Sequence, residues 1–280
     1  MNYRHGFHAG NFADVFKHAL LTRLLLYLVR KDAPLRVIDT HAGEGDYDLF
    51  GEEAERSPEW RGGIARLADL SAAPAPARTL LQPWLDIVGA LDAEGRPARY
   101  PGSPAIARAL LRPQDRAIFC ELRPDGFEAL RRRFSRDERI KTIHIDGYTG
   151  LSAYVPPKER RGLVLIDPPF ERRDEYAVMT AAFLEAQRKW PTGVYALWHP
   201  IKDTGTTRFY EALAETGVRR VLKLELCVGG VTTRLARTGL VVVNPPFVFE
   251  EEARTLLAFL APALAQGEGA GFIAEWIAGE

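Results

Sequence analysis

Five short strand-like runs constrain the fold of this 280-residue chain more than any other feature. The runs span residues 35–39, 117–121, 142–146, 163–167 and 193–198. Most segments between them are long enough for the helical crossovers that parallel strands require. Two later runs, 221–228 and 239–244, are joined by a short polar connection that contains Gly229 and Gly230. We therefore predict an α/β fold with a Rossmann-like, mostly parallel sheet and a C-terminal antiparallel hairpin.

Residues 52–98 separate the first two runs, and this gap is too long for a single helix. Prolines interrupt it repeatedly, between helical stretches such as residues 78–91. We predict a small helical insertion subdomain over residues 52–98, with residues 1–51 and 99–280 forming the main domain.

Two helix starts are predicted from residues that favour capping positions. A helix over residues 11–31 has Asn11 at its start and apolar residues at helical spacing. Ser103 and Pro104 are predicted to open the helix that leads to the second run, with Ser103 as the N-cap.

Charge balance and cysteine usage limit the kinds of partner. Lys plus Arg and Asp plus Glu number 37 each, so nucleic-acid binding needs a local basic patch. The N-terminus lacks the apolar core of a signal peptide, and no run reaches membrane-spanning length. Cys120 and Cys227 lie in apolar runs without metal-ligand spacing. We expect a cytoplasmic protein that makes no contact with membranes.

The first four runs end on or beside an acid, and ligands of parallel sheets bind at these strand ends. The turn at residues 39–43 is glycine-rich but lacks the G-x-G-x-x-G spacing, which argues against a pyrophosphate. Glu121 at the second end suits ribose hydroxyls, and Asp146 before Gly147 at the third suits an adenine amino group. S-adenosylmethionine, which carries a sulfonium, one ribose and no phosphate, fits this set.

The fourth run ends in Asp167-Pro168-Pro169-Phe170, a set of groups suited to holding the amino group of a flat base. The carboxylate accepts a hydrogen bond from the amine, the prolines fix the backbone carbonyl, and the ring stacks on the base. A similar motif at residues 244–247 follows the last strand of the hairpin, where we expect it merely to end the sheet. We therefore predict that Asp167, Pro168 and Phe170 form the catalytic group.

The segment before the first helix is rich in aromatic and basic side chains, with Tyr3, Arg4 and His5 in succession. Four of the six histidines, His5, His8, His18 and His41, lie near the first strand. We interpret them as substrate and cofactor contacts rather than metal ligands, because no acid or cysteine has the spacing of a metal site. We expect residues 3–5 to lie beside the substrate rather than to join the core. Arginines at 4, 131–133 and 160–161 are candidate phosphate contacts.

Together these residues resemble the RlmJ family of bacterial large-subunit ribosomal RNA adenine methyltransferases over nearly the whole chain. The resemblance is carried by residues 3–5, 8–11, 14–15, 17–18, 39–43, 100–104, 121, 146–147 and 167–169. It implies a Rossmann-like class I methyltransferase fold in which residues 1–51 and 99–280 form the methyltransferase domain. It implies that S-adenosylmethionine is contacted by His18, His41, Ser103, Glu121, Asp146 and Gly147, to which we add Lys17.

The resemblance further implies that Asp167 is the catalytic acid and that Tyr3 contacts the RNA. The family usually has Tyr where this chain has Phe170, so stacking is retained without a phenol hydroxyl. The predicted reaction is methylation of the exocyclic N6 of an adenine in 23S ribosomal RNA, by a monomer without a metal. The alternatives are a DNA adenine methyltransferase, a protein glutamine methyltransferase, or a catalytically silent rRNA-binding factor. The lack of an obvious target-recognition domain argues against DNA as the substrate.

Overall fold

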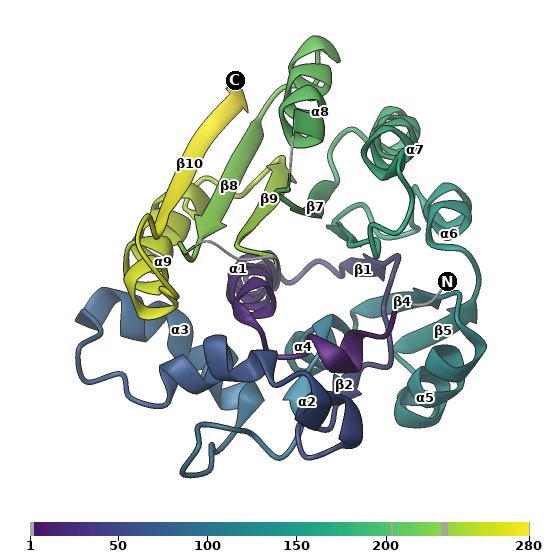
Figure 1. Cartoon of the computed structure of the whole chain (residues 1–280). Helices are drawn as coiled ribbons and strands as arrows, with labels where there is room; N and C mark the ends of the chain where they lie inside the picture. The colour runs from purple at the N-terminus through teal and green to yellow at the C-terminus, as the bar shows by residue number, and fades with distance from the viewer. Residues whose placement is uncertain (1–2, 203, 231–234, 280) are drawn as a thin grey trace.

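A single eight-stranded sheet organises the computed structural model, which describes residues 3–202, 204–230 and 235–279 (Figure 1). The strand order is β10-β8-β9-β7-β6-β1-β4-β5. The strands are β1 (Arg36–Asp39), β4 (Arg116–Glu121), β5 (Ile140–His144), β6 (Gly162–Ile166), β7 (Val194–Pro200), β8 (Val221–Cys227), β9 (Arg237–Val243) and β10 (Gly271–Ala278). All five runs predicted as parallel strands pair in parallel, since β1 lies between β4 and β6 while β5 and β7 flank these. The predicted mostly parallel sheet is confirmed.

The antiparallel part of the sheet is larger than predicted. The predicted hairpin exists, but β9 lies inside the sheet between β8 and β7 and runs antiparallel to both. An additional strand, β10, pairs antiparallel with β8 and forms the edge of the sheet. Only Ala274 of β10 is fully buried, so the strand lacks the alternation of buried and exposed residues that predicts a strand from sequence.

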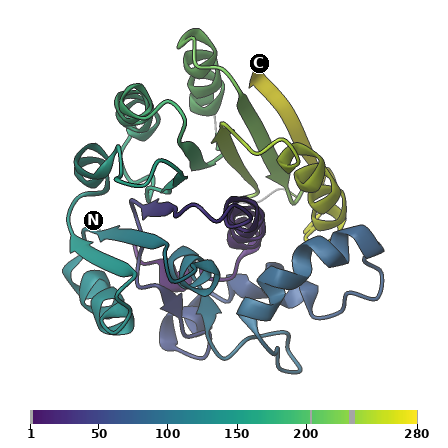
Figure 2. The ribbon, with the colours of Figure 1, turned by 180° about the vertical axis from the view of Figure 1, so that it is seen from behind.

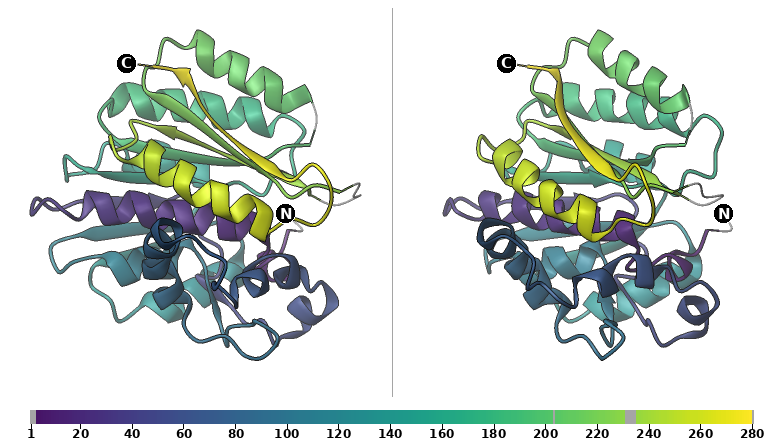
Figure 3. Two further views of the ribbon diagram at one scale, coloured as in Figure 1. Left: turned by 90° about the vertical axis from the view of Figure 1, so that its left-hand side faces the viewer. Right: turned by 60° about the vertical axis from the view of Figure 1, so that its left-hand side comes forward.

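Helices cover both faces of the sheet (Figure 3). They are α1 (Phe12–Leu28), α2 (Glu52–Arg56), α3 (Ala75–Val88), α4 (Ser103–Leu110), α5 (Pro124–Phe134), α6 (Gly147–Tyr154), α7 (Glu175–Lys189), α8 (Thr204–Glu215) and α9 (Phe249–Ala263), with 3-10 turns at His5–Phe7, Glu59–Gly62 and Ile64–Leu67. The helices α1, α3, α4 and α9 share one hydrophobic cluster, whereas α7 and α8 pack on a second. A two-stranded sheet of β2 (Asp46–Tyr47) and β3 (Tyr100–Pro101) lies apart.

Helix α1 lies at the centre of the molecule, and Figures 1 and 2 show it end-on with the other elements around it. It is buried on nearly every side because α3, α4 and α9 contact it while it also covers β6 and β9. Leu20 and Leu24 are completely buried, as expected of a helix that is apolar all round. The predicted cap is confirmed: Asn11 Oδ1 accepts a hydrogen bond from the Asp14 amide at 2.9 Å.

Residues 52–98 are helical, as predicted, and contain α2 and α3. Helix α3 packs against α1 and α9, and its Leu81 and Trp84 belong to the same hydrophobic cluster as Leu24. That residues 52–98 form a subdomain of their own stays a prediction. Within the described ranges, no helix is long and apolar enough to cross a membrane.

Candidate active site

A cavity of about 1060 Å³ opens at the carboxyl ends of the parallel strands. Twelve of the residues predicted for the site line it: Tyr3, His5, Lys17, His18, His41, Ser103, Glu121, Asp146, Gly147, Asp167, Pro168 and Phe170. Arg4 is the predicted site residue that does not line it; its exposed side chain pairs with Glu53 at 3.1 Å and reaches Asp125. The cavity therefore gathers side chains from five strand ends, α1 and the N-terminal segment.

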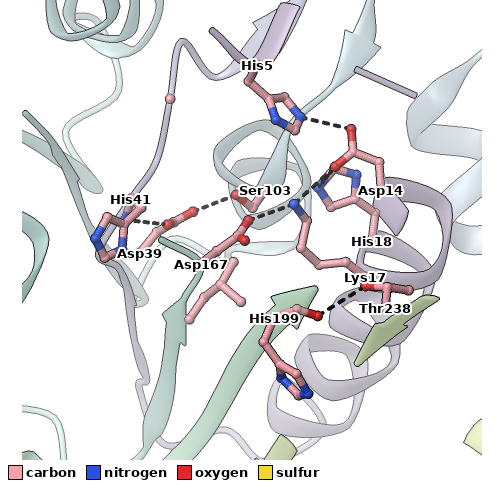
Figure 4. A network of polar contacts seen from close by, with 12 residues as sticks. His5, Asp14, Lys17, His18, Asp39, His41, Ser103, Asp167, His199 and Thr238 are labelled. Carbon is pink, nitrogen blue, oxygen red and sulfur yellow. Dashed lines mark hydrogen bonds and ion pairs between the residues drawn. The ribbon is translucent and has the colours of Figure 1, made fainter. Parts of the chain in front are cut away.

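Lys17 joins two carboxylates at the centre of this cavity (Figure 4). Its Nζ lies 2.6 Å from Asp167 Oδ2 and 3.0 Å from Asp14 Oδ1. Burial opposes the charge on the ammonium, but the two carboxylates outweigh it and raise the pKa of Lys17. Burial likewise opposes ionisation of Asp14, yet its electrostatic interactions with His5 and Lys17 and the hydrogen bond from His5 hold its pKa well below the usual range. The Lys17 ammonium fixes the position of Asp167. That it also contacts the cofactor stays a prediction.

Asp39 lies beneath the cavity and bonds to Ser103. The Ser103 hydroxyl donates to Asp39 Oδ2 at 2.7 Å, and the His41 amide donates to Oδ1 at 3.2 Å. Burial, aided by the nearby charge of Asp167 and opposed by the Ser103 hydrogen bond, raises the pKa of Asp39 to about 7. The predicted capping role of Ser103 is wrong: Gly102 is the N-cap of α4, and the serine hydroxyl serves Asp39 instead.

Glu121 and Asp146 present carboxylates that are fixed by backbone amides. Glu121 accepts from the amides of Gly43 at 2.9 Å and Arg123 at 2.6 Å, and burial raises its pKa. Asp146 is the N-cap of α6, and its Oδ1 accepts from the Thr149 amide at 2.9 Å. Each carboxylate retains lone pairs that a ligand hydroxyl or amino group can use.

Only glycine fits at position 147, where α6 begins. A Cβ atom there would stand 2.3 Å from the Thr40 carbonyl oxygen and 2.5 Å from His41 Nε2. The absence of a side chain lets α6 approach the turn after β1, and this close approach brings Asp146 to the same cavity as His41.

Two of the cavity histidines are neutral at physiological pH. Burial lowers the pKa of His18 to about 3 and that of His41 to about 4. Each ring bonds a hydroxyl through Nδ1, His18 to Tyr100 at 2.9 Å and His41 to Thr40 at 2.8 Å. No group of three or more His, Cys, Asp or Glu in the described part of the chain has the arrangement of a metal site.

The N-terminal segment is bound to two cavity loops rather than free. The Tyr3 amide donates to Glu171 Oε1 at 2.7 Å, after β6, and Arg123, after β4, donates to the Tyr3 carbonyl at 2.6 Å. The Tyr3 ring stacks on His8 with centroids 5.4 Å apart. Residues 3–5 are not part of the buried core, as expected, but the backbone groups of Tyr3 and not only its ring are bound. Whether Tyr3, Arg4 and His5 contact RNA stays a prediction.

Phe170 lies at one end of the cavity with a second aromatic residue that sequence reasoning missed. Its backbone has φ of 50°, and its ring meets Trp198 edge-on at 6.0 Å. Lys17 Nζ lies 5.5 Å from the centre of the Trp198 ring. The Trp198 indole nitrogen is buried without an acceptor among the described residues. Trp198 ends the fifth predicted strand, so extending the strand-end rule to that strand would have found it.

The second proline motif lies at the amino ends of the parallel strands, on the side of the sheet opposite the cavity. Because β9 is antiparallel, Val243 pairs with Tyr195 near the start of β7, and Asn244 Nδ2 donates to the Pro191 and Gly193 carbonyls. Residues 160–161 also lie there, immediately before β6, and Arg161 donates to the Leu28 carbonyl. These two arginines are thus poorly placed for the proposed phosphate contacts.

The strand order and the acid-lined cavity define the class of this protein: a Rossmann-like, S-adenosylmethionine-dependent methyltransferase. A family model described as "Ribosomal RNA large subunit methyltransferase D, RlmJ" matches residues 32–278. Two relatives named ribosomal RNA large subunit methyltransferase J, from Escherichia coli and Haemophilus influenzae, are each 38% identical over 100% of both chains. A crystal structure of a Legionella pneumophila protein, 33% identical, superposes with a TM-score of 0.87 over 96% of this chain and 98% of that one. The chain belongs to the RlmJ family.

Proposed function

We propose that this protein methylates the exocyclic N6 of an adenine in 23S ribosomal RNA. The observation that carries the proposal is Asp167, whose carboxylate stands before two prolines and is fixed by Lys17 in the cavity that also holds the strand-end acids. The names of the two full-length relatives support ribosomal RNA of the large subunit as the substrate class. S-adenosylmethionine supplies the methyl group when it is bound.

The lining residues fit that cofactor. Glu121 and Asp146 offer acceptors for ribose hydroxyls and an adenine amino group, and Gly147 lets α6 bring Asp146 close to the turn after β1. The cavity, at about 1060 Å³, exceeds the roughly 300–1,000 Å³ of a site for one small ligand. Its size is compatible with a cofactor and an extruded base in one cavity.

Asp167 positions the target amine in this proposal. The lone pair of an adenine amino nitrogen is delocalised into the ring, so the nitrogen is a poor nucleophile. Hydrogen bonds from its two protons to Asp167 and to the Pro168 carbonyl favour a pyramidal, more nucleophilic nitrogen. Lys17 occupies Asp167 Oδ2, which leaves Oδ1 for the amine. The surplus proton then leaves to Asp167 or through it to water.

Phe170 and Trp198 form the aromatic end of the cavity, where we place the target base. Extruding a base from a stacked strand costs a few kcal/mol. Stacking on an aromatic side chain returns about 1–3 kcal/mol. Phe170 supplies this stacking without a hydroxyl, while Tyr3, Arg4 and His5 approach from the N-terminal segment. Action as a monomer in the cytoplasm remains part of the proposal.

The test compares Asp167→Ala with Asn244→Ala, the matched change in the second proline motif. Methylation of 23S rRNA from cells that lack the modification should fall at least about 100-fold in Asp167→Ala, with cofactor affinity by calorimetry nearly unchanged. Asn244→Ala should retain activity and lose about 1 kcal/mol of stability, because two carbonyls lose their donor. The reverse pattern would show that the other motif holds the substrate.

The same assay separates the alternatives. A DNA adenine methyltransferase would label duplex or single-stranded DNA in preference to rRNA, and a protein glutamine methyltransferase would label neither nucleic acid. A catalytically silent rRNA-binding factor would bind the RNA without labelling it. The intact Asp167 and strand-end acids favour an active enzyme.

A further inference from the structure

Two cations that the sequence analysis did not single out also line the cavity. Lys202 follows the end of β7, and Arg237 begins β9. The Ile201 amide donates to the Arg237 carbonyl at 3.0 Å, so the two segments lie side by side. Because β9 runs antiparallel, its first residue lies beside the carboxyl ends of the parallel strands. A search restricted to strand ends does not find it.

Arg237 is held in place by a buried acid. Its Nη2 lies 2.9 Å from Glu225 Oε2, and the Arg237 side chain is 47% exposed while that of Glu225 is only 7% exposed. Glu225 also lies 3.9 Å from Lys223, so its position does not depend on Arg237 alone. A guanidinium carries five N–H donors, and one carboxylate oxygen leaves most of them for a second anion.

Lys202 adds a second positive charge to the cavity lining. Its side chain makes no ion pair with a carboxylate among the residues that the structure describes. By contrast, Arg172 is paired with Asp174 and Arg123 with Asp125, so the other cations of the rim are engaged. The apolar residues Ile201 and Leu235 line the cavity together with these two cations and the aromatic rings.

We propose that Arg237 and Lys202 bind the backbone phosphates of the RNA strand next to the extruded adenosine. An aromatic and apolar surface with a cationic rim matches the two parts of a nucleotide, its base and its phosphate. Glu225 preorganises the Arg237 guanidinium, while Lys202 meets a neighbouring phosphate as a mobile point charge. The inference rests on the proposed function and adds to it the path by which the RNA backbone leaves the cavity.

The test measures RNA affinity as a function of salt for purified full-length variants on unmodified 23S rRNA. Arg237→Ala and Lys202→Ala should each raise the KM for RNA about tenfold. Each should also lower the slope of log affinity against log salt by about 0.7, the contribution of one single-strand phosphate. Cofactor affinity and kcat at saturating RNA should remain within about twofold of the wild type.

Matched controls lie far from the cavity. Arg254 on α9 is paired with Glu250 at 2.8 Å and is 48% exposed, nearly as much as Arg237. Arg254→Ala and Lys158→Ala, which remove charges that do not line the cavity, should leave the salt slope unchanged. If the alanine variant fails to fold, Arg237→Gln replaces it, since Gln keeps a side-chain N–H donor for Glu225 and removes the positive charge.

The outcomes separate this inference from the proposed function. If Arg237→Ala and Arg237→Gln lose thermal stability but keep the wild-type salt slope and KM, Arg237 merely neutralises Glu225 and the inference is wrong. An unchanged slope in Lys202→Ala contradicts it as well. If the wild type itself fails to label ribosomal RNA, the proposed function is wrong, whatever these variants show.

Discussion

Asp14 is the residue on which the centre of the site depends. Its Oδ2 accepts from His5 Nε2 at 2.9 Å and from the Gly10 amide at 3.0 Å, while its Oδ1 pairs with Lys17. Lys17 in turn holds Asp167. A chain of charged contacts therefore runs from the N-terminal segment to the proposed catalytic carboxylate. Lys17 on α1 was predictable as a cation at the site. Its contact with Asp167, which follows β6, was not, because sequence spacing gives no contact between distant elements.

Lys17→Met tests whether this ammonium supports Asp167 or the cofactor. The change leaves two buried carboxylates without their cation, so unfolding free energy should fall by about 3–5 kcal/mol. Methylation should fall sharply while the affinity for S-adenosylmethionine stays within a few-fold of the wild type. Calorimetry and a chemical denaturation series give both quantities, and a selective loss of cofactor binding would return Lys17 to the cofactor site.

His199 gives the protein a pH-dependent stability. Its ring is fully buried and bonds Tyr210 at 2.7 Å, and burial lowers its pKa from 6.5 to about 3. Between these values the unfolded chain binds a proton that the folded chain does not. Stability from this residue is therefore complete above about pH 6.5 and is lost as pH falls, by up to about 1.4 kcal/mol per pH unit.

Urea denaturation at several pH values between about 4 and 6.5 checks this prediction. His199→Phe keeps an aromatic ring but cannot be protonated, so its stability should fall less steeply with decreasing pH than that of the wild type. The comparison concerns the slope and not the absolute stability, which the loss of the Tyr210 hydrogen bond also changes. Equal slopes would contradict the low pKa of His199.

Elements were predictable where burial is regular and were missed where it is not. The parallel strands β6 and β7 and helix α1 have continuous or periodic apolar residues, so their sequence alone indicates them. The less buried strand β5 begins two residues before its predicted range. The edge strand β10 is half exposed, and the N-terminal segment is fixed by backbone hydrogen bonds to distant loops. Neither kind of interaction leaves a periodic trace in the sequence.

Tyr3 and Arg4 are adjacent in the chain but should differ in their effect on stability. Tyr3→Ala removes the ring stacked on His8 and the hydroxyl bound to His5 at 2.8 Å, so the thermal midpoint should fall by about 2–4 °C for each kcal/mol lost. Arg4→Ala, at an exposed position, should change stability by less than about 0.5 kcal/mol. Calorimetric scans compare the two variants. Equal midpoints would indicate that the segment is not ordered in solution.

At the scale of the whole molecule, the helical insertion shares its core with the sheet. Leu81 of the insertion and Leu24 of α1 are both completely buried in one hydrophobic cluster. The bounds of the insertion at residues 52–98 stay a prediction. What these residues pack against was not predictable from the sequence, because it depends on contacts with α9, which lies far along the chain.

Leu81→Ala and Leu24→Ala should therefore lower the same unfolding transition. Each change leaves a cavity and should cost about 2–5 kcal/mol. A common core predicts a single cooperative transition for the wild type and for both variants, by circular dichroism and by tryptophan fluorescence. A separate early transition in Leu81→Ala alone would show that residues 52–98 unfold as a subdomain of their own.

The backbone of Tyr3 joins the loop after β4, which follows the acid proposed for the cofactor ribose, to the loop after β6, which follows the acid proposed for the target amine. A ligand that stabilises one loop therefore stabilises the hydrogen bonds between both loops and the Tyr3 backbone and, through them, the other loop. Thermodynamic linkage makes such an effect reciprocal: the factor by which bound cofactor strengthens RNA binding equals the factor by which bound RNA strengthens cofactor binding. The two substrates of one reaction would then act as effectors of each other through a single residue of the N-terminal segment.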